Sequence, residues 1–316
     1  MNTIIYVHKG NSYYLHLSIS QAKKYNPDCE ILLFGDESNK DVPNATHYEI
    51  KQYMGLANKF DEVFFNNSPN RRSYELFCFQ RWFIIKEFMM KNPQYNTDFV
   101  YCDSDTLLFS DVTNDLKHLS PNLMATESWE SPAFTFFKKD VLSDFCDMIM
   151  WLYTTKEGLD TIIYYINKFE REATGQSISD MTAFMHYTTV FRSSKCLDAQ
   201  LPTLSWDKAI SESTTLFCYD HNINIDNGFE TDRWGRKNIR FCKGKPIGIL
   251  KKDGSPVQFK GLHFQGDAKY MMIRAQSTSP MSFSLFKKYV SGYLVYRIKV
   301  FIRHLFKTLG LSLRKI

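Results

Sequence analysis

Two short segments, far apart in the chain, contain the residues best suited to chemistry. The first is the apolar run 99–102, which is followed at once by Asp103-Ser104-Asp105. The second is the segment 262–269, which supplies a histidine, a glycine and a lysine within seven positions. Carboxylate oxygens are the ligands that Mg²⁺ and Mn²⁺ prefer, and Mn²⁺ also accepts an imidazole nitrogen. Together the segments predict a divalent-metal site with a cationic neighbour, which can hold a nucleotide diphosphate and offset its charge as it leaves.

Each motif has a simpler interpretation when it stands alone. In an extended segment Asp103 and Asp105 point to one side and Ser104 to the other, so both carboxylates can reach one ion. A D-x-D triplet can equally be a solvated turn after a strand, and a single His263 can be a structural histidine. The apolar run before Asp103, and the presence of both motifs in one chain, favour the metal site.

The two motifs in combination resemble those of GT-A glycosyltransferases, in particular the group of glycogenin and the bacterial lipopolysaccharide galactosyltransferases. That group carries a D-x-D after a hydrophobic strand and a late H-F-x-G-x-x-K. The chain matches every fixed position of both, with Asp103-Ser104-Asp105 and with the segment from His263 to Lys269. The similarity in the order of elements covers residues 1–270, whereas only the two motifs are specific.

This resemblance implies a metal-dependent glycosyltransferase. The enzyme would move a sugar from a nucleotide-diphosphate sugar, with a UDP-sugar as the expected donor, to a hydroxyl of a glycan or glycolipid acceptor. Asp103, Asp105 and His263 would coordinate Mn²⁺, or Mg²⁺ in its place, and Asp103 would also meet the nucleotide. Gly266 and Lys269 would contact the diphosphate.

Further donor contacts are expected near the ends of the early strands. The resemblance assigns Arg81, a basic residue on the helix before the D-x-D strand, to the donor sugar or phosphate. For a UDP-sugar, Val7, His8 and Asp36 are expected around the uracil and ribose. Ser104 is expected to contact the nucleotide as well. The simpler interpretation of His8 is an ordinary loop residue.

The chain departs from the family pattern at two places. Lys269 is followed by Tyr270-Met271 instead of Pro-Trp, so the loop is expected to run differently. The acceptor-side helix of the family opens with Asp-Gln, where this chain has Asp180-Met181, and this leaves open whether configuration is retained or inverted. An inverting enzyme needs a carboxylate base, for which Asp180 is the candidate. In a retaining enzyme Asp180 would instead position hydroxyl groups, and its simplest interpretation is a helix N-cap.

Strand and helix patterns alternate along the chain, which predicts an α/β fold with a mostly parallel, doubly wound sheet flanked by helices. The resemblance implies that this fold is the Rossmann-like GT-A fold. The expected strands are Thr3–Val7, Glu30–Phe34, Thr46–Ile50, Asp98–Tyr101, Leu123–Thr126 and Ala133–Phe137. The expected helices are Asn11–Tyr25, Tyr74–Met90, Val141–Tyr153, Thr161–Glu172 and one over Asp180–Tyr187. Ligands bind at the carboxyl ends of parallel strands, so His8, Asp36 and the two aspartates are expected to line one crevice.

The composition is that of a folded globular chain. Of 316 residues, 44% are hydrophobic and 23% are charged, which excludes a disordered protein. No window of about 18 residues lacks charge, so no membrane-spanning helix is expected. The first residues lack the basic and apolar regions of a signal peptide. Seven scattered cysteines without a Cys-x-x-Cys pair favour free thiols and a cytoplasmic protein.

The end of the chain differs in charge from the rest. From Ala268 onward there are ten Lys or Arg and no Asp or Glu, within a chain of net charge +5. We therefore expect a glycosyltransferase domain over 1–270 and a basic segment over 271–316. From Phe286 onward, large apolar residues recur at helical spacing among basic ones, which predicts a basic amphipathic helix.

Such a helix suits an anionic membrane surface, bound through residues 283–316. The protein would then be peripheral on the inner face of the membrane, where a lipid-linked acceptor is natural. Alternatively, the helix docks on the domain with a solvated basic face. A nucleic-acid partner is not expected, because many large apolar residues are interleaved.

Two other functions stay open. One is a nucleotidyltransferase-like nucleotide enzyme, for which the segment from His8 to Ser12 is a poor phosphate loop. The other is a non-catalytic membrane-surface protein, in which the aspartates and the histidine are incidental.

Overall fold

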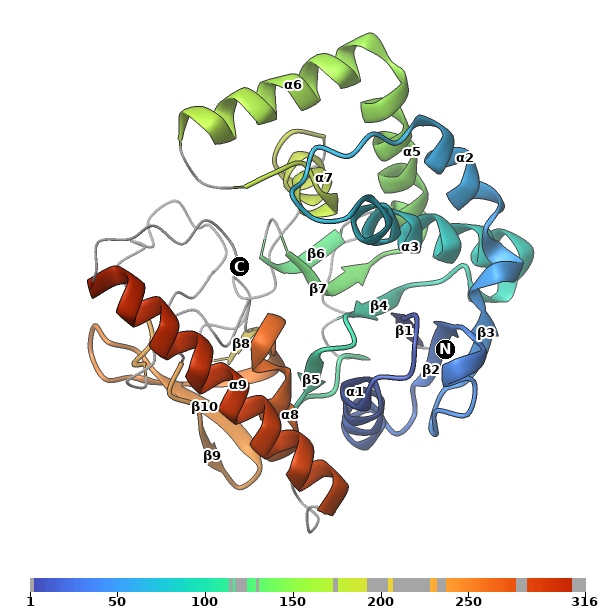
Figure 1. Ribbon diagram of the computed structural model, residues 1–316. Helices are drawn as coiled ribbons and strands as arrows, with labels where there is room; N and C mark the ends of the chain where they lie inside the picture. The colour runs from blue at the N-terminus through green and yellow to red at the C-terminus, as the bar shows by residue number, and fades with distance from the viewer. Residues whose placement is uncertain are drawn as a thin grey trace.

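A mostly parallel sheet forms the centre of the computed structural model (Figure 1). The structure describes residues 3–113, 116, 124–128, 131–172, 176–191, 204–206, 228–231, 237–276 and 283–308. Six strands of this part of the chain follow one another across the sheet in the order β3 (Thr46–Glu49), β2 (Glu30–Gly35), β1 (Thr3–Val7), β4 (Phe99–Cys102), β7 (Ser131–Phe137) and β6 (Met124–Ser128). The first four are parallel to one another, and β7 and β6 are added in antiparallel fashion.

Helices cover both faces of this sheet, because its central strands are apolar on both sides. Along β1, Ile5 faces one core and Ile4 faces the other, as strand alternation requires. On the first face lie α2 (Gly55–Val63), α3 (Arg72–Lys91), α5 (Val141–Thr154) and α7 (Asp180–His186), with α6 (Lys156–Arg171) packed on α5. On the second face lies α1 (Tyr13–Tyr25). The predicted α/β fold with a mostly parallel sheet flanked by helices is therefore confirmed.

A second, smaller sheet was not foreseen from the sequence. Its strands are β5 (Thr106–Leu108), β11 (Pro256–His263), β10 (Lys245–Ile249) and β9 (Arg240–Cys242), with β8 (Leu204–Trp206) beside β11. Strand β5 starts directly after the D-x-D triplet and pairs antiparallel with the end of β11, so that Thr106 lies opposite His263. This pairing brings the two sequence motifs together.

Most predicted elements differ from the observed ones by only a few residues at their ends. Helix α6 is an exception, since it begins at Lys156, five residues before the predicted start. The side chain of Thr155 caps it by accepting a hydrogen bond from the backbone of Gly158. Glycine is a weak helix former, so Gly158 weakened the helical pattern of the first turn and the start of α6 was predicted too late. The short helical elements in this part of the chain are η1 (Glu37–Asn39), η2 (Ile50–Tyr53), η3 (Pro93–Tyr95) and the π-helical η4 (Tyr187–Phe191).

The basic segment near the end of the chain folds as predicted into a helix, α9 (Phe283–Thr308). Before it come the 3-10 helix η6 (Gly266–Met271) and the short helix α8 (Met272–Ala275), and α9 packs on both (Figure 1). The domain boundary expected after residue 270 falls inside η6. Within the described ranges, no helix combines the length and apolar character needed to span a membrane. Residues 309–316 lie outside the described part of the chain.

The core around Trp82 of α3 should dominate the stability of this fold. The indole is fully buried and contacts the rings of Tyr101 and Phe184. We predict that Trp82→Ala lowers the free energy of unfolding by about 3–5 kcal/mol in urea titrations, because it removes the ring and leaves a cavity. The exposed Tyr164 of α6 is the control, and Tyr164→Ala should change the free energy of unfolding by no more than about 0.5 kcal/mol. Equal losses for both variants would contradict this packing.

Candidate active site

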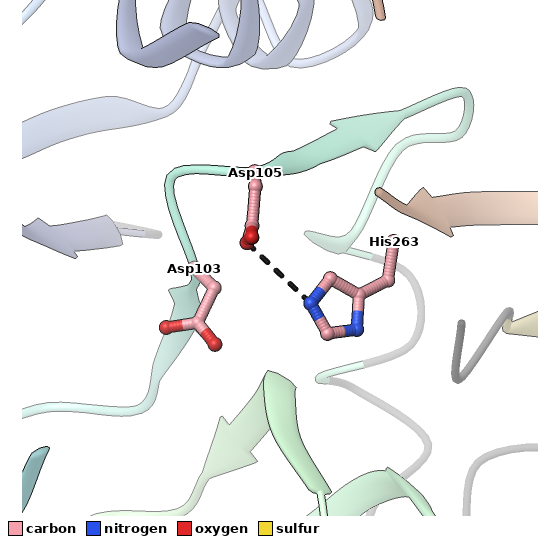
Figure 2. A group of neighbouring side chains, drawn as sticks. All are labelled: Asp103, Asp105 and His263. Atoms are coloured by element: carbon pink, nitrogen blue, oxygen red, sulfur yellow. Dashed lines mark ion pairs between the residues drawn. The ribbon is translucent and has the colours of Figure 1, made fainter. Parts of the chain in front are cut away.

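Two aspartates and one histidine converge where the two sheets meet (Figure 2). Asp103 and Asp105 come from the turn between β4 and β5, and His263 is the last residue of β11. One ligand atom from each of the three side chains lies within 4.8 Å of the others. His263 is 6% exposed, so the cluster is largely shielded from solvent. Two carboxylates and one imidazole form a donor set that suits Mn²⁺.

The D-x-D triplet forms a tight turn, so the expectation of an extended segment was wrong. The backbone N–H and the hydroxyl of Thr106 both donate to the carbonyl of Asp103, at 3.2 and 2.6 Å. The chain must turn here because β4 belongs to the large sheet and β5 to the small one. The two carboxylates nevertheless lie close together, and the turn places Asp105 beside His263 (Figure 2).

Asp105 is surrounded by positive or ionisable neighbours. Lys269 Nζ lies 2.6 Å from Oδ2, and His263 Nε2 lies 3.4 Å from Oδ1. Burial alone would raise the pKa of Asp105, but the imidazole of His263 and the ammonium group of Lys269 outweigh this effect and hold the pKa well below its usual range. Asp105 is therefore ionised at neutral pH and can serve as a metal ligand.

Arg81 of α3 connects Asp103 with Asp180. Its Nη1 donates to Asp103 Oδ1 at 2.6 Å, and its Nη2 donates to Asp180 Oδ2 at 2.5 Å. The hydroxyl of Tyr101 accepts from Arg81 at 2.8 Å and donates to Asp103 at 2.6 Å. Burial raises the pKa of Tyr101 well above its ordinary value, which keeps the hydroxyl protonated as a donor. One cation thus holds two carboxylates, and the predicted role of Arg81 at the donor stays a prediction.

Asp180 is the first residue of α7 and is 3% exposed. It is not the helix N-cap, since Ser179 takes that position and forms a capping box with Thr182. The carboxylate of Asp180 instead accepts from Arg81 and, at 3.4 Å, from the indole of Trp82. Burial raises the pKa of Asp180, and the guanidinium of Arg81 offsets this only in part.

The ends of the parallel strands do converge, as expected. His8 follows β1, whose last residue is the buried Val7, and its Nδ1 lies 3.0 Å from the hydroxyl of Ser104. Burial lowers the pKa of His8, so the ring is neutral at neutral pH. Its Nε2 is buried and has no hydrogen-bond partner among the described residues.

Asp36, at the end of β2, holds the loop after β1. It accepts from the backbone of Gly10 at 2.6 Å and of Ser38 at 2.9 Å. Burial works to raise the pKa of Asp36, but these hydrogen bonds lower it below the ordinary value. Asn39 completes the clamp by donating to the carbonyls of His8 and Gly10, at 3.0 Å each. In this structure the carboxylate of Asp36 shapes the loop that carries His8.

Gly266 opens η6 with a backbone φ of +58°, a conformation that other residues adopt only with strain. A Cβ there would meet no atom within 4 Å, so the conformation, and not space, requires glycine. This geometry turns the chain out of β11 and leads it to Lys269, which reaches Asp105.

A cavity of about 310 Å³ lies beside Asp180. Its lining comes from the loop before α3, from α3, from Phe169 of α6, from α7 with the residues just before it, and from the residue before η6. The polar lining residues are Asn70, Tyr74, Glu75, Gln176, Ser177, Ser179, Asp180, Thr182 and Gln265. The cavity can therefore receive a polar molecule next to the Arg81–Asp180 pair.

Sequence reasoning missed Tyr101 and Tyr14. Tyr101 was counted as a core strand residue, although its position two residues before Asp103 puts both on one side of the chain. Tyr14 of α1 contacts two site residues, with its ring 5.4 Å from Lys269 Nζ and 5.6 Å from the ring of His8. Nothing in the local sequence distinguishes it from a core residue.

No protein-family model and no curated protein matches the chain. Among solved structures, apo mouse xyloside xylosyltransferase 1 is 7% identical, with a TM-score of 0.42, over 66% of this chain and 88% of that one. The apo bifunctional glycosyltransferase WbbM is 11% identical, with a TM-score of 0.48, over 90% of this chain and 51% of that one. The galactosyltransferase LgtC with donor and acceptor sugar analogs is 11% identical, with a TM-score of 0.32, over 58% and 69%. Each TM-score is below 0.5, so these structures support no assignment of function to this chain.

The buried Arg81–Asp180 pair should be energetically coupled. We predict that Arg81→Met lowers the free energy of unfolding by about 3–5 kcal/mol, because it leaves buried carboxylates without their cation. In a double-mutant cycle with Asp180→Asn, urea titrations should give a coupling energy above about 1 kcal/mol.

A matched control lies on the same helix, five residues after Arg81. Lys86 pairs with Asp147 at 2.6 Å, but the Asp147 carboxylate is 68% exposed. The cycle of Lys86→Met with Asp147→Asn should give less than about 1 kcal/mol. Equal coupling energies in the two cycles would show that the Arg81 network is no stronger than a surface ion pair.

Proposed function

We propose that this chain is a metal-dependent glycosyltransferase that moves a sugar from a nucleotide-diphosphate sugar, with a UDP-sugar as the expected donor, to a hydroxyl of a glycan or glycolipid. The observation that carries the proposal is the β5–β11 pairing, which gathers Asp103, Asp105 and His263 within 4.8 Å and sets Lys269 beside them. Oxygen and imidazole ligands next to an ammonium group suit a divalent cation and a diphosphate together.

The residues fit Mn²⁺ or Mg²⁺ as the cofactor. Asp103, Asp105 and His263 would hold the cation, which when bound offsets the negative charge that develops on a departing diphosphate. Lys269 adds a positive charge at the same place, on a turn whose glycine permits close approach of the backbone. His8, held by Ser104, would border the nucleotide, and Asp36 would fix the loop that carries His8.

Asp180 is proposed to act on the acceptor side. It lines the polar cavity, and its raised pKa makes it a better proton acceptor than an exposed carboxylate. In an inverting transfer it would take the proton of the acceptor hydroxyl, whereas in a retaining one it would orient hydroxyl groups. Arg81 holds the carboxylate in place for either role.

No second function is favoured by an observation. A nucleotidyltransferase would need the loop after β1 to present a cation to phosphates, but Lys9 lies over the ring of Phe77, 4.2 Å from its centroid. A non-catalytic role would not explain why the D-x-D triplet and His263 lie close together.

The donor site can be tested by calorimetry with UDP. We predict that UDP binds with Mn²⁺ and that binding is at least about tenfold weaker in EDTA, because the ligands then face the diphosphate without a cation. Asp105→Ala should remove the metal dependence. Asp147→Ala, which deletes an exposed carboxylate, should bind as wild type.

GDP and CMP serve as comparison ligands in the same titrations. Binding of GDP in preference to UDP would keep a glycosyltransferase and change the donor. No metal-dependent binding of any of these nucleotides would contradict the proposal.

Replacing Asp180 should change the rate of sugar transfer without changing the affinity for the donor nucleotide. With the UDP-sugar that a screen of donors identifies, Asp180→Asn should reduce kcat by about 10²–10⁴, because an amide cannot accept the proton or pair fully with Arg81. The Kd of UDP with Mn²⁺ should stay within about threefold of wild type, since donor phosphates are held elsewhere. An unchanged kcat would remove Asp180 from the reaction.

We further propose that α9 holds the enzyme on an anionic membrane surface at the inner face of the membrane. Four apolar side chains of this helix are exposed by about half: Phe286, Leu294, Val295 and Ile298. Of these, Leu294 and Ile298 lie one turn apart on the side opposite Tyr289 and Gly292, and this pair is called the outer strip. The same helix carries exposed lysines at Lys287 and Lys299. Basic helices with an apolar side bind anionic lipid surfaces in this way.

This membrane proposal predicts the effect of Leu294→Ser combined with Ile298→Ser. Sedimentation with vesicles of phosphatidylcholine and phosphatidylglycerol should show at least about tenfold weaker binding, because two apolar side chains no longer enter the lipid. Ile163→Ser, at an exposed position of α6, is the control and should bind as wild type. Equal vesicle binding by all three proteins would contradict the membrane role.

A further inference from the structure

Helix α9 packs on the turn that carries Lys269. Tyr270, the residue after Lys269 in η6, is 3% exposed. Its ring lies 5.6 Å from that of Tyr289 and 6.4 Å from that of Tyr293, one turn apart on α9. The chain departs from its family pattern at Tyr270, and this is the residue on which the helix docks.

The helix approaches Tyr270 so closely that only glycine fits. A Cβ on Gly292 would lie 2.4 Å from the Cβ of Tyr270 and 2.8 Å from its Cγ. Glycine inside a helix costs about 1 kcal/mol relative to alanine, so its presence in the middle of α9 requires a compensating contact. The close approach of the α9 backbone to Tyr270 is that contact.

A second line of contacts connects α9 with the site. Lys288 Nζ lies 5.1 Å from the ring centroid of Tyr13, and this ring lies 5.5 Å from that of Tyr14. Tyr14 in turn contacts both His8 and Lys269. The helix therefore reaches two candidate donor residues through two groups of aromatic side chains.

We propose that α9 is a positioning element of the donor site and that Gly292 and Tyr270 are its positioning residues. Short 3-10 turns such as η6 are weak by themselves and depend on what packs around them. With α9 seated, η6 holds Lys269 against Asp105, so the ammonium group is preorganised for a diphosphate. This inference rests on the proposed function, because it assigns Lys269 to the diphosphate.

One consequence concerns the membrane. The inner side of α9 contacts η6, while the outer strip faces away from it and is exposed. A lipid surface bound by the outer strip would then be separated from η6, the turn that carries Lys269, only by α9 itself. The helix that binds the surface is also the helix that arranges Lys269.

The test is Gly292→Ala, compared with Ser291→Ala at the exposed neighbouring position. Titrations use UDP and UMP with Mn²⁺, because both carry uridine but UDP has the second phosphate that Lys269 would meet. Gly292→Ala should weaken UDP binding by about tenfold or more, the effect of losing a charge-assisted contact. UMP binding should be much less affected, and Ser291→Ala should bind both nucleotides as wild type.

The ratio of UDP to UMP affinity separates positioning from general loss of structure, which would weaken both nucleotides alike. Tyr289→Ala, which removes one ring from Tyr270, is a second variant and should lower the same ratio. Wild-type ratios in Gly292→Ala and Tyr289→Ala, with wild-type UDP binding intact, would overturn this inference alone. Failure of the wild type to bind UDP with Mn²⁺ would overturn the proposed function and this inference together.

Discussion

The antiparallel pairing of β5 with the end of β11 is the interaction on which the rest of the site depends. It sets Thr106 opposite His263, and the backbone of Phe264 donates to the carbonyl of Asp105 at 2.8 Å. Because β4 lies in the large sheet and β5 in the small one, the D-x-D triplet must turn between them. The same pairing fixes where β11 ends, and therefore where η6 and Lys269 begin. A slip of this register by one residue would point His263 to the opposite face and dissolve the cluster.

Charge balance is the second constraint on this site. Three aspartates lie close together in a largely buried region, and each is held by a cation: Asp103 and Asp180 by Arg81, and Asp105 by Lys269. Buried carboxylates without partners would be strongly destabilising, so these cations maintain the geometry as well as the charge. The arrangement places a positive group on both sides of the D-x-D turn. The proposed donor, negatively charged and accompanied by a divalent cation, would lie between such groups.

The sequence allowed prediction of the large sheet, of most of its helices and of the residues at the strand ends, because alternation and helical spacing are local signals. Helix α2 (Gly55–Val63) was not predicted. His8 and Ser104 meet, as do Gly10 and Asp36, since parallel strands end at one edge. The small sheet was not predictable, because β5 has three residues and finds its partner far along the chain. Tyr14 and Gly292 were missed for the same reason, since their roles come from contacts between distant segments. Tyr101 was missed although its spacing from Asp103 is a local signal. The D-x-D turn was misjudged because nothing local shows that the chain changes sheet there.

The central claim is that Asp103, Asp105 and His263 hold one divalent cation beside a nucleoside diphosphate. The most direct test is pulsed electron paramagnetic resonance of the protein with Mn²⁺ and UDP, which detects a nitrogen nucleus bound to the metal. We predict nitrogen modulation of the Mn²⁺ signal in the wild-type complex, its loss in His263→Gln, and its retention in His16→Gln, which changes an imidazole of α1. A wild-type complex without nitrogen modulation, or an unchanged signal in His263→Gln, would contradict the account.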